Sequence, residues 1–272
     1  MFVQSSSTWK RQAALPAALL VLATGCAHPA ETRTQLAFAH FVIPQGPVPV
    51  PAAAATEPID ESVDATQTAA YHYAQLDRGA CEAELTRRSI PWTPAGESRG
   101  VLAPVRLAGP VGGVSYHTGL SPKDRATSVN EVFDCRLILA LDDFSAILQQ
   151  HGIVEVIHMS GWRPPSAKHW PAGKLGTRHD GALALDAGWF VRRDGTKLNV
   201  EKDFHGRIGA KTCGPGTGPW PATPEAIELR NIACEAAQAH LFQVELTPDY
   251  NWPHRNHFHL EVTPNVKWFL VH

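Results

Sequence analysis

The chain has 272 residues, of which 44% are hydrophobic and 18% charged, and its formal net charge is −2. This is the composition of a globular protein that can bury a sizeable core, within the range of one domain with extensions. The near-neutral charge argues against a nucleic-acid-binding protein, which needs a basic surface to neutralise phosphates. No apolar run reaches about 18 residues, so we expect no transmembrane helix in the mature chain.

Residues 1–26 have the pattern of a secretory signal, with two basic residues before the short apolar run AALPAALLVLAT. The run leads into ATGC (residues 23–26), which resembles a bacterial lipobox, in which the cysteine is lipidated and becomes the new N-terminus. The alternative is an ordinary signal peptide in which Cys26 is incidental. We therefore expect a lipoprotein of the bacterial cell envelope that faces the periplasm, and Ala27 favours the outer membrane.

Four cysteines remain when Cys26 is set aside: Cys81, Cys135, Cys213 and Cys234. An even number of cysteines in an oxidising compartment is consistent with two disulfides. None of the four forms a CxxC pair, so a cysteine-based zinc site is not expected.

Residues 27–70 are rich in Pro, Ala, Thr and Gln and show no sustained period. A segment of this composition buries little apolar area, so we interpret it as a flexible tether between the membrane and a folded domain. The domain is expected to span residues 71–272 and to be a monomer.

Residues 130–152 (NEVFDCRLILALDDFSAILQQHG) predict the clearest helix, with an apolar stripe at three- and four-residue spacing and Gly152 as its stop signal. The stripe consists of Leu137, Leu141, Phe144 and Leu148. A shorter helix is expected at residues 80–90, and a buried strand at residues 154–159.

Thr223 and Pro224 have the pattern of another helix start, a capping residue followed by a proline suited to the first turn. Strands are expected at residues 183–191 and 257–262. Because helices precede strands without a run of βαβ units, this order predicts an α+β fold, a small antiparallel sheet with helices packed on one side.

The last predicted strand contains HFHLE, and side chains alternate between the two faces of a strand. His257, His259 and Glu261 therefore share one face. The apolar residues Phe258, Leu260 and Val262 share the other face and would anchor the strand in the core. We expect the histidines to face a cleft.

The segment GTRHDGALALDAGWF (residues 176–190) offers further metal ligands, His179 and Asp186. Their separation of seven would place them on opposite faces of a regular strand, so we expect His179 in the turn before it. Taken alone, the pair His257 and His259 is more often a packing or surface feature than a metal site. The pair His179 and Asp186 alone can be a simple hydrogen bond. Two His and one Asp together suit a catalytic Zn²⁺ that keeps its fourth position for water. His254 and His257 are then the candidates for a base.

At these residues the chain resembles a known family. RHDGALALD is similar to the S/T-x-H-x6-D motif of zinc peptidases that cleave peptidoglycan, and HRNHFHLEV to their H-x-x-H-x-H pattern. The runs ALDAGWFVRRDGTKLNV and PDYNWPHRNHFH resemble the extensin-like C-terminal family of bacterial proteins, with the resemblance covering about residues 78–264. The related peptidases include D-Ala-D-Ala carboxypeptidases and murein endopeptidases and share a hedgehog-like fold.

The resemblance implies a role for each residue of the site. His179, Asp186 and His259 would bind the zinc, His254 would be the general base, and His257 would stabilise the transition state or share the proton transfer. Arg163 matches an arginine that these enzymes use near the substrate, although a structural salt bridge explains it equally well.

The chain departs from the family pattern near SGWR, where relatives often have a cysteine that would pair with Cys234. The resemblance then implies that Cys213 replaces this partner, which leaves Cys81 with Cys135.

The leading hypothesis is a zinc metallopeptidase that acts on peptidoglycan stems or cross-links. Its main alternative is a non-catalytic, zinc-containing module that binds the cell wall, and a purely structural lipoprotein is a third possibility.

Overall fold

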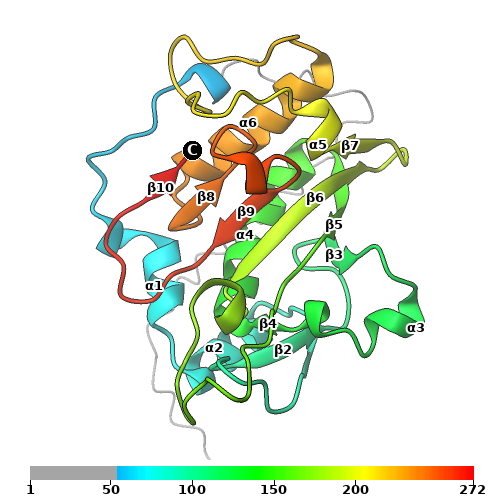
Figure 1. Cartoon of the computed structure of the whole chain (residues 1–272), viewed down its shortest axis with the longest axis vertical. Coiled ribbons are helices and arrows are strands. Elements are labelled where there is room, and N and C mark those ends of the chain that lie inside the picture. Colours follow the sequence, from blue (N-terminus) through cyan, green and yellow to red (C-terminus); the bar gives the residue numbers. More distant parts are fainter. Residues whose placement is uncertain (1–53) are drawn as a thin grey trace, which may run out of the picture. The chain divides into compact units, whose positions relative to one another are not determined.

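A computed structural model describes residues 54–272 (Figure 1). Its helices are α1 (Ala69–Gln75), α2 (Arg78–Arg87), α3 (Pro122–Arg125), α4 (Cys135–Gln150), α5 (Val200–Asp203) and α6 (Pro224–Gln238). Five 3₁₀ turns are η1 (Ala54–Thr56), η2 (Ala65–Gln67), η3 (Val129–Glu131), η4 (Arg178–Gly181) and η5 (Trp252–His254). The predicted signal segment, with Cys26, lies outside the described residues.

The strands form two sheets. The smaller, antiparallel sheet has the order β1-β2-β4, made of β1 (Trp92–Pro94), β2 (Pro104–Leu107) and β4 (Phe133–Asp134). The larger sheet has the order β10-β8-β9-β6-β5-β3, and β7 also pairs with β6. Its strands are β3 (Ser115–Thr118), β5 (Ile153–His158), β6 (Ala184–Arg192), β7 (Lys197–Asn199), β8 (Val244–Leu246), β9 (Phe258–Glu261) and β10 (Leu270–Val271).

The predicted combination of helices with antiparallel strands is confirmed, but the larger sheet is mixed rather than wholly antiparallel. Its central pairs, β8–β9, β9–β6 and β6–β5, are antiparallel, whereas β10–β8 and β3–β5 are parallel. The pair β3–β5 is parallel because α4 forms a crossover between the two strands. Each strand missed from the sequence has at most four residues, too short for a recognisable alternation of apolar and polar residues.

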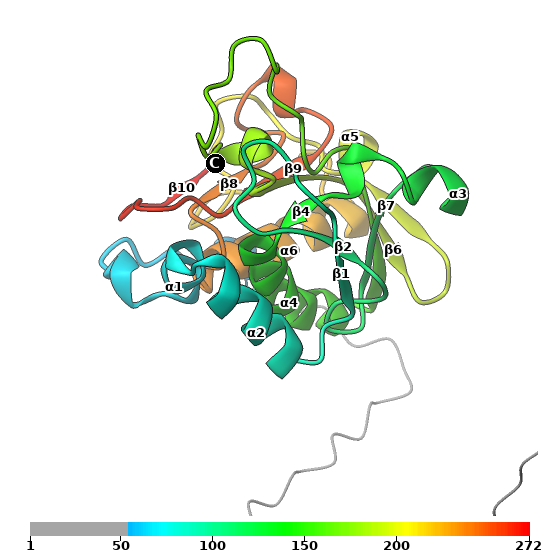
Figure 2. The same ribbon diagram turned by 90° about the horizontal axis from the view of Figure 1, so that it is seen from below.

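The core lies between the larger sheet and the helices, with α4 and α6 on one face of the sheet (Figure 2). The predicted stripe of α4 is buried there, as are Phe258 and Leu260 of β9. The helix starts and stops also follow the sequence signals. The Thr223 side chain accepts a hydrogen bond from the Ala226 N–H at the start of α6, and Gly152, with φ 69°, follows the end of α4.

Two disulfides join parts of the structure that are distant in sequence. Cys81 of α2 is bonded to Cys135 at the start of α4, and Cys213 is bonded to Cys234 of α6. Both predicted pairs are therefore present, and each holds a peripheral segment against one of the two core helices.

Residues 54–70, which the sequence assigns to the tether, contain η1 and η2 and contact the domain. The Ala55 N–H donates to Asn231 Oδ1 of α6 at 3.2 Å, and the Ala55 carbonyl accepts from the Gly214 N–H at 2.9 Å. These contacts are made by the backbone of Ala55, and backbone contacts require no periodic apolar pattern. The sequence therefore did not indicate that residues 54–70 contact the domain. No helix within residues 54–272 is both long and apolar enough to cross a membrane.

One buried carboxyl group makes the fold sensitive to pH. Glu245 of β8 lies opposite Leu260 on the core face of the sheet and is 1% exposed. Neither of its carboxyl oxygens has a hydrogen-bond partner among the described residues. Burial therefore raises the pKa of Glu245 well above its ordinary value of 4.5.

The raised pKa predicts a loss of stability at high pH. The folded state holds the Glu245 proton more tightly than the unfolded chain does. The stability that the protonated carboxyl group retains is therefore complete below about pH 4.5, and the free energy of unfolding falls as the pH rises toward the folded-state pKa. We expect Glu245→Gln to raise the free energy of unfolding more at pH 8 than at pH 4.5, measured by urea denaturation. The exposed Glu97→Gln is the control, and an equal effect of Glu245→Gln at both pH values would contradict the prediction.

Candidate metal centre

The centre is built on the pairing of β6 with β9. In this antiparallel pair Asp186 lies directly opposite His259. Side chains of directly opposite residues lie on the same face with their Cβ atoms about 5 Å apart. His259 and Glu261 therefore face Asp186, while Phe258 and Leu260 enter the core, which is the alternation predicted from the sequence.

His179 reaches the same point from η4, the turn before β6, as the sequence predicts. The backbone of this turn packs against residue 176, because a Cβ on Gly181 would lie 2.4 Å from the Gly176 carbonyl oxygen. Arg178 and Ala182, at the two ends of the turn, have φ values of 51° and 54°, in the left-handed region that costs non-glycine residues energy. The surrounding contacts thus hold His179 in a strained turn beside Asp186.

Three imidazoles surround one oxygen of Asp186. Its Oδ1 lies 3.1 Å from His179 Nε2, 3.0 Å from His259 Nδ1 and 3.3 Å from His257 Nε2. All four side chains are buried. The structure therefore brings together three predicted ligands and one of the two predicted bases.

The outer nitrogen of each imidazole contacts an oxygen that accepts hydrogen bonds. His179 Nδ1 lies 2.7 Å from the Gly161 carbonyl oxygen, and His259 Nε2 lies 3.0 Å from Glu261 Oε2. His257 Nδ1 lies 2.8 Å from an oxygen of Asn256, its chain neighbour. These acceptors require N–H on the outer nitrogens, so in the neutral rings the lone pairs point inward, toward Asp186.

Lone pairs directed at a carboxylate repel it unless a positive charge lies between them. A proton serves one imidazole nitrogen at a time, whereas a metal ion accepts several lone pairs together. Ligand atoms around a tetrahedral zinc with bonds of about 2.0–2.1 Å are about 3.3 Å apart, close to the separations from Asp186 Oδ1. The candidate ligand atoms of His179, Asp186 and His259 all lie within 4.8 Å of one another, so this donor set fits a zinc ion.

The pKa directions agree with a site for positive charge. Burial by itself would raise the pKa of Asp186, but hydrogen bonds from His179, His257 and His259, which need protons on their inner nitrogens, hold it below the usual range. Such protons supply the positive charge at the place that a bound cation would take. Burial would lower the pKa of His259, yet its contacts with Asp186 and Glu261 raise it. The carboxylate is therefore ionised and attracts a cation into the centre.

The second oxygen of Asp186 faces away from the imidazoles. Oδ2 accepts a hydrogen bond from Ser160 Oγ at 2.7 Å and from the Arg163 guanidinium. Arg163 Nη2 also donates to Ser160 Oγ at 2.8 Å. Its side chain remains 58% exposed, so the structure shows the salt bridge that the sequence left as an alternative and leaves the guanidinium accessible to a substrate.

His254 lies in η5 and is only half-buried, unlike the four side chains that meet at Asp186 Oδ1. Its ligand atom, with those of His257 and His259, forms a second group within 4.8 Å. The Asn251 side-chain oxygen lies 2.6 Å from His254 Nδ1, and because this oxygen accepts, Nδ1 carries the proton. The lone pair of the neutral ring is therefore on Nε2. Burial, then the neighbouring imidazoles of His257 and His259, lowers the pKa of His254 to about 4, which leaves its ring neutral at pH 7.

Several residues that orient the side chains of the centre were not identified as such from the sequence: Ser160, Asn251, Asn256 and Glu261. Of these four, only Glu261 was indicated by the sequence, because it lies two residues after His259 and so shares its strand face. The contacts of Ser160 with Asp186 join residues 26 apart in sequence, and no local pattern marks them.

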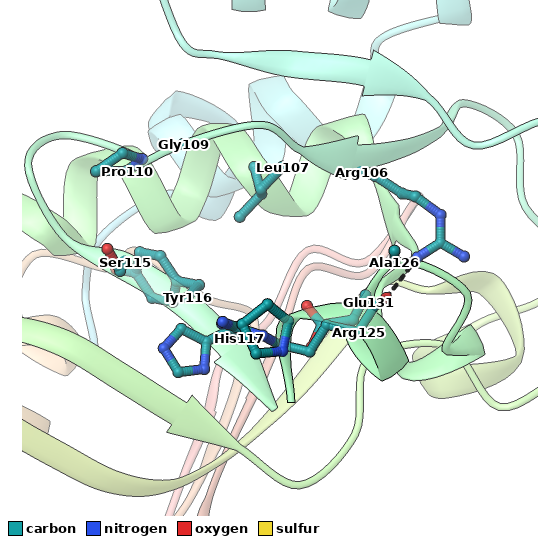
Figure 3. Close-up of a pocket in the computed structure, with 11 residues that line it drawn as sticks. Arg106, Leu107, Gly109, Pro110, Ser115, Tyr116, His117, Arg125, Ala126 and Glu131 are labelled. Carbon is teal, nitrogen blue, oxygen red and sulfur yellow. Dashed lines mark hydrogen bonds between the residues drawn. The ribbon is translucent and has the colours of Figure 1, made fainter. Parts of the chain in front are cut away.

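A hollow of about 300 Å³ lies elsewhere, between β2 and β3 (Figure 3). Its lining includes Leu107, Tyr116 and His117, and Arg106 at its edge donates to the Arg125 carbonyl oxygen at 3.4 Å. None of the histidines around Asp186 lines this hollow, so it is separate from the candidate metal centre.

Comparisons with known proteins give one match. No curated protein and no solved structure matches the chain. A family model described as "Extensin-like protein C-terminus" matches residues 80–270, which include every residue of the candidate metal centre. The chain therefore belongs to the extensin-like protein C-terminus family.

Proposed function

We propose that this protein is a zinc-dependent peptidase that hydrolyses peptide bonds of peptidoglycan stems or cross-links. The observation that carries the proposal is the convergence of inward imidazole lone pairs on the buried Asp186 carboxylate. The resemblance of RHDGALALD and HRNHFHLEV to peptidoglycan-cleaving zinc peptidases supplies the substrate class, and with it a hedgehog-like fold. The predicted lipid anchor on Cys26 would keep the enzyme at the cell envelope, facing the periplasm.

His179, Asp186 and His259 would hold the zinc, which when bound polarises a carbonyl group and acidifies a water molecule. Ser160 and Arg163 keep Asp186 oriented through its outer oxygen. Glu261 orients His259 from the other side.

His254 would accept the proton of the water molecule that attacks the substrate. Its ring is neutral, its Nδ1 is held by Asn251, and it lies on the half-buried side that a substrate reaches. His257 lies between His254 and Asp186, where it assists the proton transfer or stabilises the developing charge. The exposed guanidinium of Arg163 is available for a substrate carboxylate.

The proposal is tested by incubating the zinc-loaded protein with purified muropeptides and separating the products by mass spectrometry. We expect new peptide fragments that disappear when a chelator is present and return when zinc is restored. If metal-loaded protein left every stem and cross-link intact but sedimented with sacculi, the non-catalytic wall-binding alternative would replace the peptidase.

The assignment of ligands predicts which variants lose zinc. Removing a donor by His259→Ala or Asp186→Asn should weaken zinc binding by more than about 100-fold, beyond the range of losses from outer contacts. Zinc content measured by mass spectrometry, together with titration calorimetry, checks this result. The exposed His72→Ala is the matched control, and unchanged zinc binding in His259→Ala would contradict the assignment.

Glu261 is predicted to act through His259. Its loss in Glu261→Ala leaves the His259 ring without its outer acceptor, so we expect zinc affinity to fall by about 10–100-fold. The control is Glu155→Ala, which removes a carboxylate that lies 3.1 Å from His117 Nε2, outside the centre. Equal zinc affinities of the two variants would show that Glu261 does not orient the ligand.

A variant of His254 distinguishes the two possible ligand groups, because His254 belongs to only one of them. If it is the base, His254→Ala should retain zinc while kcat falls by about 10²–10⁴-fold, the usual contribution of a general base. Zinc content and muropeptide kinetics are measured on the same preparation. Loss of zinc from this variant would instead place the metal among His254, His257 and His259.

A further inference from the structure

A cavity of about 360 Å³ adjoins the turn that carries His254. One wall comes from residues 200–208 and the other from residues 248–255. Trp252, which lines it, is the first residue of η5, and His254 is the last. A 3₁₀ turn rises about 2 Å per residue, so the backbone positions of Trp252 and His254 are about 4 Å apart along its axis. The lining of the cavity therefore begins within one turn of backbone from His254, which borders the candidate metal centre.

The most exposed wall of the cavity is an aromatic ring. Trp252 is 67% exposed, and neighbouring Ile208 is 53% exposed. The Arg255 guanidinium lies 4.5 Å from the centre of the indole ring and also donates to the Trp252 carbonyl oxygen at 3.2 Å. Arg255 thereby stacks against the ring and limits its movement, and because Trp252 stays 67% exposed, much of the ring remains accessible to a ligand.

The backbone beneath the platform is held by Asp249, which is fully buried. Asp249 Oδ1 accepts from the Arg207 N–H at 2.6 Å, and its carbonyl oxygen accepts from the Gly209 N–H at 2.6 Å. The buried Arg230 guanidinium lies 3.0 Å from Asp249 Oδ2. These bonds join the two walls of the cavity, so a ligand would meet a preformed site.

The charges of the lining balance. Glu201 Oε1 lies 3.9 Å from Arg255 Nε, and the only other titratable group of the lining is His205. A charged peptide therefore finds no unmatched charge here. An aromatic platform beside hydrogen-bonding groups suits a neutral ligand with one apolar face and a polar edge.

We propose that this cavity binds an N-acetylated amino sugar of the glycan strand, next to the stem peptide that the metal centre cleaves. The sugar ring stacks on Trp252, its hydroxyl groups reach Glu201 and His205, and the acetyl methyl group contacts Ile208 and Pro248. The proposal rests on the proposed peptidoglycan substrate and names the part of that substrate that fixes its position.

Titration calorimetry with tri-N-acetylchitotriose tests the site on the zinc-loaded chain. We expect Trp252→Ala to weaken binding about tenfold or more, since stacking on an aromatic ring is worth a factor of this order. Trp252→Phe, which keeps an aromatic face, should bind within about threefold of the unmodified protein. Trp268→Ala, which removes an exposed tryptophan outside the cavity, should leave binding unchanged.

Absence of chitotriose binding, or binding that Trp252→Ala does not change, would overturn the proposal. Equal binding of maltotriose, which has no acetamido group, would overturn the assignment to amino sugars. Chitotriose contains no stem peptide, so this measurement is independent of peptide hydrolysis. Retained chitotriose binding without muropeptide cleavage would reject the peptidase alone, and cleavage without saccharide binding would reject the cavity alone.

A kinetic comparison gives a second readout. For the unmodified protein, KM should be lower for a muropeptide that carries its sugars than for the free stem peptide. The ratio of the KM for the free stem peptide to the KM for the muropeptide should therefore exceed one. Trp252→Ala should reduce this ratio toward one, and Trp268→Ala should leave it unchanged. A ratio that is the same in the unmodified protein and in Trp252→Ala would contradict the proposal.

Discussion

The buried carboxylate of Asp186 is the constraint on which the candidate site depends. A carboxylate that is 2% exposed is costly to bury unless its oxygens are compensated. Here Oδ2 is satisfied by Ser160 and Arg163, whereas Oδ1 faces three imidazoles whose outer nitrogens are already committed. The arrangement is electrostatically complete only with a positive charge at Oδ1, and a metal ion there would accept lone pairs from more than one imidazole at once.

The fold brings these groups together through the register of one strand pair. Asp186 is opposite His259 because β6 and β9 pair at that position, and the apolar residues of both strands lock the register from the core side. A slip of one residue would turn His259 into the core and Phe258 toward the candidate metal centre. The same packing that stabilises the sheet therefore sets the geometry of the ligands, while η4 and η5 bring His179 and His254 from outside the pair.

A second buried carboxylate, Asp249, has a comparable role beside η5. It joins the backbone of residues 207–209 to the segment that leads to Trp252, and Arg230 compensates its charge. The neighbouring Asn251 then caps η5 and contacts the His254 ring. Both the proposed base, His254, and the proposed sugar platform thus depend on one segment held by Asp249, which would keep the saccharide and peptide parts of a substrate in a constant relation.

Local patterns in the sequence determined the long helices, the strands β5, β6 and β9, and the face on which His259 and Glu261 lie, because period and capping depend on neighbouring residues. Spacing and resemblance also indicated His179 and Asp186 as partners. Only the tertiary structure decided that His257 Nε2 lies 3.3 Å from Asp186 Oδ1, nearly as close as the nitrogens of the expected ligands at 3.1 and 3.0 Å. It also decided that β3 joins the sheet in parallel, and that Ser160 and Asn251 orient the site. These contacts connect segments through space or through short turns, and no local pattern of residues records them.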